Sequence, residues 1–168
     1  RYNPVGDFGR ITEVASRTAR QLPGEGQSAT FREFVWRYVN VIAKAMSALG
    51  RRIDYDAILN YGQDIEPLLI DYLCFLLENK IGEGWSDIVD QVEGRFEEKE
   101  LKVPRQLQDR TNRSHALIKV AKDYGVVDSV AGGLIKTFEY DKAFFDKLVA
   151  SLLPLMEKLT SGKVAELI

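Results

Sequence analysis

The sequence predicts an all-α fold, an irregular bundle of seven to eight helices that forms one domain over residues 1–168. Three observations support this prediction. Apolar residues recur at three- and four-residue steps over long stretches, and helix start and stop signals bracket those stretches. No segment shows the sustained alternation of apolar and polar residues that is typical of a strand. A chain of 168 residues with 45 % apolar residues can bury a core without disulfides or metals.

The first half of the chain contains the clearest helix signals. We expect helices over residues 10–21, Thr30–Leu49, Asp54–Tyr61 and Leu68–Leu77. Thr30 and Glu33 form a capping-box pattern, and Gly50 occupies the usual position after a helix C-terminus. Asp54 can cap the next helix, Gly62 can end it, and Pro67 suits the first turn of the helix that follows.

The second half predicts a further series of helices. Ser86 can cap one that carries acidic residues on one side, and Pro104 can start a long one that ends near Tyr124 before Gly125. A shorter helix is expected over Val127–Phe138. Asp141 can cap a last long helix, and Ser161 can start a tail helix.

Charge is distributed in blocks along the chain, although the net charge is only −2. Residues 1–52 carry nine Lys or Arg against four Asp or Glu, and residues 53–101 carry three against thirteen. Residues 102–122 then carry six against one. Blocks of one sign indicate the chemistry of partners better than the total charge does, although solvated helix faces can also cluster by chance.

Two sets of charged residues are therefore candidates for binding. Arginine-rich helix faces suit phosphate backbones or acidic protein segments, and an acidic face suits a basic partner. The basic candidates are Arg51, Arg52, Arg105, Arg110 and Arg113. The acidic candidates are Asp87, Asp90, Glu93 and Glu97. An ordinary solvated surface is the alternative interpretation of both sets.

No motif predicts catalysis, a metal site or a cofactor. A phosphate-binding loop of the Walker type is missing, and Asp7-Phe8-Gly9 matches a kinase triplet without the rest of the kinase signature. His115 is the single histidine, and we expect it on the surface or half-buried on a helix. Cys74 is the single cysteine and is expected to be a buried structural thiol. Acidic pairs such as Asp87 and Asp90 are better explained by the acidic block.

Several stretches of the first half resemble TraD-like conjugative coupling proteins of type IV secretion systems. They are Asn3-Pro4 after an aromatic residue, residues 6–13 (GDFGRITE), residues 21–28 (QLPGEGQS) and residues 31–37 (FREFVWR). In that family an Asn-Pro loop leads from the ATPase core into an inserted all-helical domain. The resemblance covers residues 1 to about 72, and beyond that it consists of helical character and length.

The resemblance implies that this chain belongs to a membrane-anchored hexameric ATPase that moves single-stranded DNA and its attached relaxase during conjugation. The helical domain would lie on the cytoplasmic face of the bacterial inner membrane, with relaxosome or relaxase proteins, single-stranded DNA and the rest of the ATPase as its partners. ATP and Mg²⁺ would belong to the parent chain. Both ends of the sequence also look like cuts within a longer chain.

These observations favour a non-catalytic module that recognises cargo, monomeric when isolated. One alternative is an architectural domain that caps the motor ring and packs between subunits. A second alternative is an independent helical enzyme, which would need a cluster of catalytic residues that the sequence does not supply. The identity of the cargo, and whether DNA or protein is the main ligand, stay open.

Overall fold

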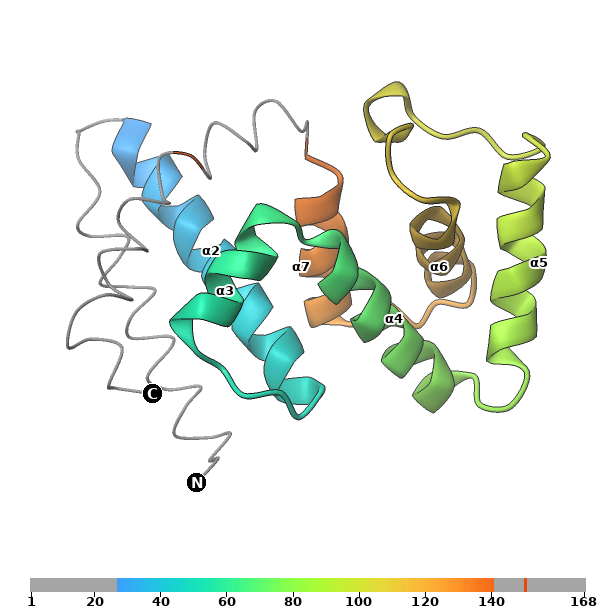
Figure 1. The fold of residues 1–168 in the computed structure, drawn as a ribbon, viewed down its shortest axis with the longest axis horizontal. Coiled ribbons are helices and arrows are strands. Elements are labelled where there is room, and N and C mark those ends of the chain that lie inside the picture. Colours follow the sequence, from blue (N-terminus) through green and yellow to red (C-terminus); the bar gives the residue numbers. More distant parts are fainter. Residues whose placement is uncertain (1–26, 141–149, 151–168) are drawn as a thin grey trace. The chain divides into compact units, whose positions relative to one another are not determined.

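The computed structural model describes residues 27–140 together with residue 150. Within these residues the fold is all-α, with six α-helices, one 3-10 helix and no strand (Figure 1). The all-α prediction is therefore confirmed. The helices expected over residues 10–21 and after Asp141 lie outside the described residues, so the described part holds fewer helices than the seven to eight predicted. No helix of this part is long and apolar enough to cross a membrane.

The chain divides into two compact units, and in the described part their boundary falls between Asp64 and Ile65. The first unit contains α2 (Gln27–Ala48) and α3 (Tyr55–Gln63). The second unit, residues 65–142, contains the other four α-helices and the 3-10 helix η1.

In the first unit, α2 begins three residues before the predicted cap, so Thr30 lies inside the helix. The predicted end is confirmed: Gly50 has a φ of +71°, and the Arg51 amide donates to the carbonyl of Met46. This is the usual glycine-terminated helix end.

Asp54 caps α3 as predicted, because its Oδ1 accepts a hydrogen bond of 2.7 Å from the Ala57 amide. Gly62 does not end this helix but lies inside it. A Cβ added at Gly62 would approach the Tyr38 hydroxyl oxygen to 2.5 Å. Tyr38 belongs to α2 and is buried. Glycine is therefore needed at position 62 for close packing of α2 and α3.

The second unit is built around α6 (Asn112–Asp123), which packs against both α4 (Glu66–Lys80) and α5 (Trp85–Glu97) (Figure 1). Most of α6 is buried, including Leu117, Val120 and Ala121. The fourth helix, α7 (Ser129–Phe138), packs against α4. Pro67 occupies the first turn of α4, as predicted.

Asp128 joins α7 to α4 and was not singled out in the sequence. Its Oδ1 accepts from the Ala131 amide at 2.7 Å and so caps α7, while its Oδ2 accepts from the Tyr72 hydroxyl at 2.6 Å. One carboxylate thus accepts hydrogen bonds from a free backbone N–H group and from the hydroxyl of a buried tyrosine of the neighbouring helix. The aspartate that precedes Ser129 is the signal from which this cap could have been predicted.

Two predicted helix starts in this unit are wrong. The helix α5 begins at Trp85 after Gly84, whose φ is +92°, so Ser86 lies inside the helix and caps nothing. The long helix expected from Pro104 is interrupted: η1 spans only Arg105–Leu107, and α6 begins after Thr111. Thr111 ends the irregular segment because its hydroxyl accepts from the Ser114 amide at 3.2 Å, which caps α6. Gly125 ends α6 with a φ of +65°, as predicted.

Candidate functional site

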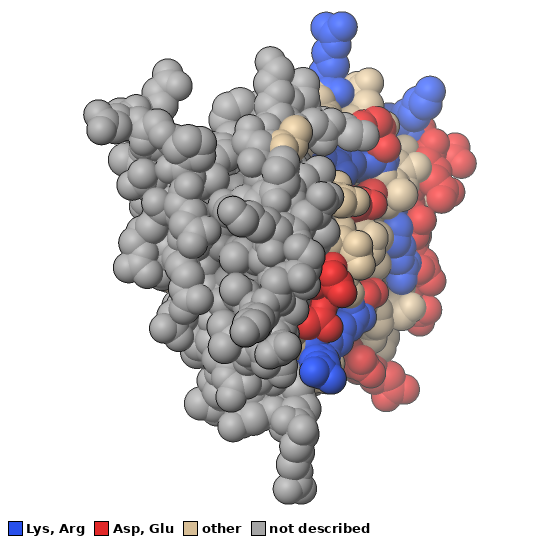
Figure 2. Space-filling view, turned by 60° about the vertical axis from the view of Figure 1, so that its left-hand side comes forward, with Lys and Arg blue, Asp and Glu red and all other residues tan. Residues whose placement is uncertain are grey.

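The acidic surface consists of Asp87, Asp90, Glu93 and Glu97, all on α5. Their positions fall on one broad side of the helix, and Glu93, one turn after Val89, the one fully buried residue of α5, lies at the edge of that side nearest the core. Asp87, Asp90 and Glu97 are exposed, and Glu93 is half-buried. Acidic side chains gather along the right-hand edge of the described surface in Figure 2. The sequence pattern therefore placed these carboxylates on one helix side correctly.

Arg113, a basic candidate, lies against this acidic surface. Its Nη1 donates to Asp90 Oδ1 at 2.7 Å and to Glu93 Oε1 at 3.2 Å. Burial opposes the charge of Arg113, but these two bonds outweigh it and raise the pKa of the guanidinium. Only 31 % of the Arg113 side chain is exposed. A phosphate would have to displace two charge-assisted hydrogen bonds to reach it.

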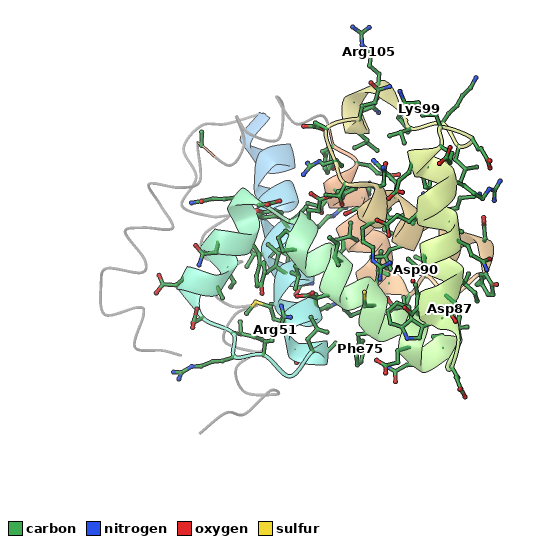
Figure 3. The ribbon with its side chains drawn as sticks, turned by 45° about the vertical axis from the view of Figure 1, so that its right-hand side comes forward. Arg51, Phe75, Asp87, Asp90, Lys99 and Arg105 are labelled. Atoms are coloured by element: carbon green, nitrogen blue, oxygen red, sulfur yellow. The ribbon has the colours of Figure 1, made fainter. Side chains whose placement is uncertain are left out.

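Asp87 and Glu97 form the part of the acidic surface that Arg113 leaves uncompensated. Neither carboxylate has an ion pair within residues 27–140. Figure 3 shows Asp87 near the beginning of α5 and Asp90 nearer to the middle of the helix. Because α5 packs against α6 and Arg113 of α6 binds two of its carboxylates, these charges lie on a helix that is held by tertiary contacts.

Arg110 is held inside the unit. It is half-buried, and its Cζ lies 4.9 Å from the centre of the Phe138 ring of α7, which is cation–π geometry. The contact joins the turn before α6 to α7. We therefore interpret Arg110 as a structural residue, since a nucleic-acid ligand would have to compete with the ring.

The remaining basic candidates are spread over both units. Arg51 and Arg52 follow the end of α2 in the first unit, where Arg51 Nη1 donates to the Tyr61 hydroxyl at 2.6 Å and Arg52 is exposed. Arg105 is exposed in η1 of the second unit. Within the second unit, Arg110 and Arg113 bind other side chains, so Arg105 is the basic candidate of that unit whose side chain is exposed.

A group of hydrogen bonds to the carboxylate of Glu66, which the sequence did not reveal, fixes the start of α6. Glu66 Oε2 accepts from the Ser114 hydroxyl at 2.6 Å, from the Thr111 hydroxyl at 3.0 Å and from the Thr111 amide at 3.1 Å. Partial burial would raise the pKa of Glu66, but the three donors together lower it below its usual value. Glu66 precedes Thr111 by 45 residues, so no local pattern could have indicated this pairing.

His115 is buried, with 7 % of the residue exposed, so the prediction of a surface or half-buried histidine is wrong. Its Nε2 lies 3.0 Å from the Leu107 carbonyl oxygen, and its ring packs between Phe96 and Phe138. Because a carbonyl can only accept, Nε2 carries the proton in the neutral ring. Burial lowers the pKa of His115. The side chain therefore links η1 to α6.

Cys74 is half-exposed on α4, so the prediction of a buried thiol is wrong. Partial burial still raises the pKa of the thiol, which lowers its reactivity at neutral pH. The described residues contain no group of three or more His, Cys, Asp or Glu that could hold a metal ion. The described residues therefore offer charged side chains on helices, which can bind a partner of opposite charge.

Comparison of the chain with protein-family models, with curated proteins and with solved structures finds no match. The function is therefore inferred from the charged surfaces described above and from the sequence resemblance to coupling proteins.

Proposed function

We propose that this chain is a non-catalytic recognition module of a TraD-like conjugative coupling protein and that it binds relaxosome or relaxase proteins on the cytoplasmic face of the inner membrane. The resemblance of residues 1–72 supports the family. The observation that carries the proposal is the acidic surface of α5, where Asp87 and Glu97 are exposed without an ion pair in the described part of the chain.

A basic protein is the partner that this surface fits. Exposed negative charges on a helix repel nucleic acid, which is also negative, and attract positively charged surfaces. Ion pairs between this surface and a partner would contribute mainly to the rate of association and to specificity. Each exposed ion pair stabilises a complex by only about 0.2–1 kcal/mol. Proteins that handle DNA carry basic surfaces, so a relaxosome component is a complementary partner.

The test is charge reversal in the complete coupling protein. Asp87→Lys combined with Glu97→Lys should lower the frequency of DNA transfer between cells at least tenfold, while the ATPase activity and the hexamer stay intact. Asn60→Lys is the control, because Asn60 is exposed on α3 and does not belong to α5. It should leave transfer unchanged.

Two results would contradict the proposal. Unchanged transfer by the double variant would mean that the acidic surface is not a docking site. Loss of transfer together with weakened hexamers would instead favour the architectural alternative, in which the domain packs between subunits.

A further inference from the structure

We propose that protonation of His115 releases the segment that connects α5 to α6, so that the second unit contains a pH-sensitive switch. This η1 segment consists of residues 98–111 and includes η1 (Figure 1). The switch does not depend on the acidic surface or on its partner. Either proposal can therefore fail without the other.

The η1 segment is anchored next to His115. Leu107 is the single buried residue of the segment, and its carbonyl oxygen lies 3.0 Å from Nε2 of His115. Closer to α6, the Cζ atom of Arg110 lies 4.9 Å from the centre of the Phe138 ring. Arg105, in contrast, is exposed and points away from the helices (Figure 3). The segment thus meets the helices at the ring of His115 and at the ring beside it.

A proton on His115 would place two positive charges beside one aromatic ring. The rings of His115 and Phe138 meet edge-on with their centroids 6.2 Å apart, and Arg110 already lies over the Phe138 ring. His115 also packs against the Phe96 ring of α5, at 5.7 Å. Aromatic rings do not replace the hydrogen bonds that water gives to an imidazolium ion, so a charge in this buried position is costly.

The groups around His115 decide the direction of the effect. Burial lowers the pKa of His115 and the charge of Arg110 adds to this, whereas the carbonyl of η1 and the carboxylate of Glu66 on α4 oppose it. The neighbouring side chains of α5 and α7 are uncharged aromatic rings. The pKa of His115 is therefore lowered while the segment is closed, and acid favours any state in which water reaches the ring.

The η1 segment is the element that can move to admit this water. Arg113 holds α5 to α6, and the Tyr72 hydroxyl binds the residue that caps α7. The segment, in contrast, contains one short 3-10 helix and buries only Leu107. Displacing one leucine exposes less apolar surface than displacing a helix, so local opening needs less free energy. The hydrogen bonds at Thr111 keep α6 capped while the segment opens.

The experiment combines NMR titration with hydrogen exchange on the unchanged chain. His115 is the single histidine, so its titration is read directly, and the midpoint should lie below about 6.5. The amides of Leu107 and Arg110 form hydrogen bonds within the segment and report its opening. After correction for the intrinsic rate, their protection should fall about two- to tenfold between about pH 7.5 and 5.5, because a pKa of about 6.5 in the open state limits the effect.

Low concentrations of urea separate local opening from unfolding of the whole unit. The urea dependence of an opening reaction grows with the surface that it exposes. Exchange of the Leu107 and Arg110 amides should therefore respond little to urea. Exchange of the Val120 amide, in the buried part of α6, should accelerate strongly, because it requires unfolding of the unit.

Three variants test the groups that make up the switch. Arg110→Gln removes the second positive charge, so the titration midpoint of His115 should rise. Lys102→Gln is the matched control, because Lys102 is an exposed cation of the same segment and should leave the midpoint unchanged. His115→Gln retains an N–H donor but cannot be protonated, so protection of the Leu107 amide should become the same at both pH values.

Three results would overturn the switch. They are a titration midpoint at or above about 6.5, protection of the segment that does not change with pH, and a urea dependence of the Leu107 amide equal to that of the Val120 amide. The last result would mean that acid unfolds the unit as a whole. All three are measured on the unchanged chain, so they decide the matter even if His115→Gln fails to fold.

Discussion

Removal of the Glu66 carboxylate tests how the second unit is held together. Glu66→Ala deletes the acceptor of three hydrogen bonds, from the Thr111 amide, the Thr111 hydroxyl and the Ser114 hydroxyl. A hydrogen bond to a charged group contributes about 1.5–3 kcal/mol. The two hydroxyls, 3.0 Å apart, can still bond to each other, and the site is partly open to water. We therefore expect a total loss of about 1.5–3 kcal/mol in the free energy of unfolding.

The pH dependence supplies the second half of this prediction. The pKa of Glu66 is lowered in the folded chain, so its stabilisation is present above the unfolded pKa of about 4.3 and is lost as pH falls through the folded pKa. The difference between the unchanged chain and Glu66→Ala should therefore be large at pH 7 and shrink at about pH 3. Urea unfolding followed by circular dichroism at both pH values measures it.

Glu78→Ala is the control for this experiment, because Glu78 is exposed on the same helix. It should change the stability by less than about 0.5 kcal/mol. If Glu66→Ala behaved like Glu78→Ala at pH 7, the three hydrogen bonds would not stabilise the fold, and the explanation of the broken helix before α6 would have to be abandoned.

Three further predictions follow from packing and burial. Gly62→Ala should destabilise the chain by about 1–2 kcal/mol, because its Cβ would meet the buried Tyr38 hydroxyl. Gly94→Ala should stabilise the chain by about 0.5–1 kcal/mol, because no atom lies within 4 Å of the added Cβ and alanine favours a helix more than glycine does. Thermal unfolding of the two variants measures both changes in stability. His115 has a lowered pKa, so stability should fall as pH drops below about 6.5, and His115→Gln should flatten that part of the pH profile. Arg113→Ala should cost about 1–2 kcal/mol in urea unfolding, because it frees two carboxylates on α5; a neutral effect would mean that the bridge is not formed in solution.

Local signals in the sequence predicted much of the fold. Asp54, Pro67, Gly50 and Gly125 act as helix caps, starts or ends in the way their residue types indicate, since a cap is decided by a few neighbouring residues. The acidic side of α5 was also visible, because helical spacing alone places residues on one side of a helix.

Contacts between distant segments could not be predicted in the same way. The helix expected from Pro104 is broken because Glu66, far away in the sequence, stabilises the cap at Thr111. The sequence predicts Arg113 as part of a basic surface, but it binds carboxylates about 20 residues earlier. The burial of His115 depends on rings from two other helices. In each case, the tertiary fold brings together residues that are far apart in the sequence, and no periodic pattern in the sequence indicates such a contact.

The measurement that tests the central claim most directly is the affinity of the purified chain for the relaxase of the same conjugative element, determined by titration calorimetry. Recognition through the acidic surface predicts saturable binding that Asp87→Lys with Glu97→Lys weakens at least tenfold and that Asn60→Lys leaves unchanged. Equal affinities for all three chains, or no binding to any relaxosome protein, would contradict it.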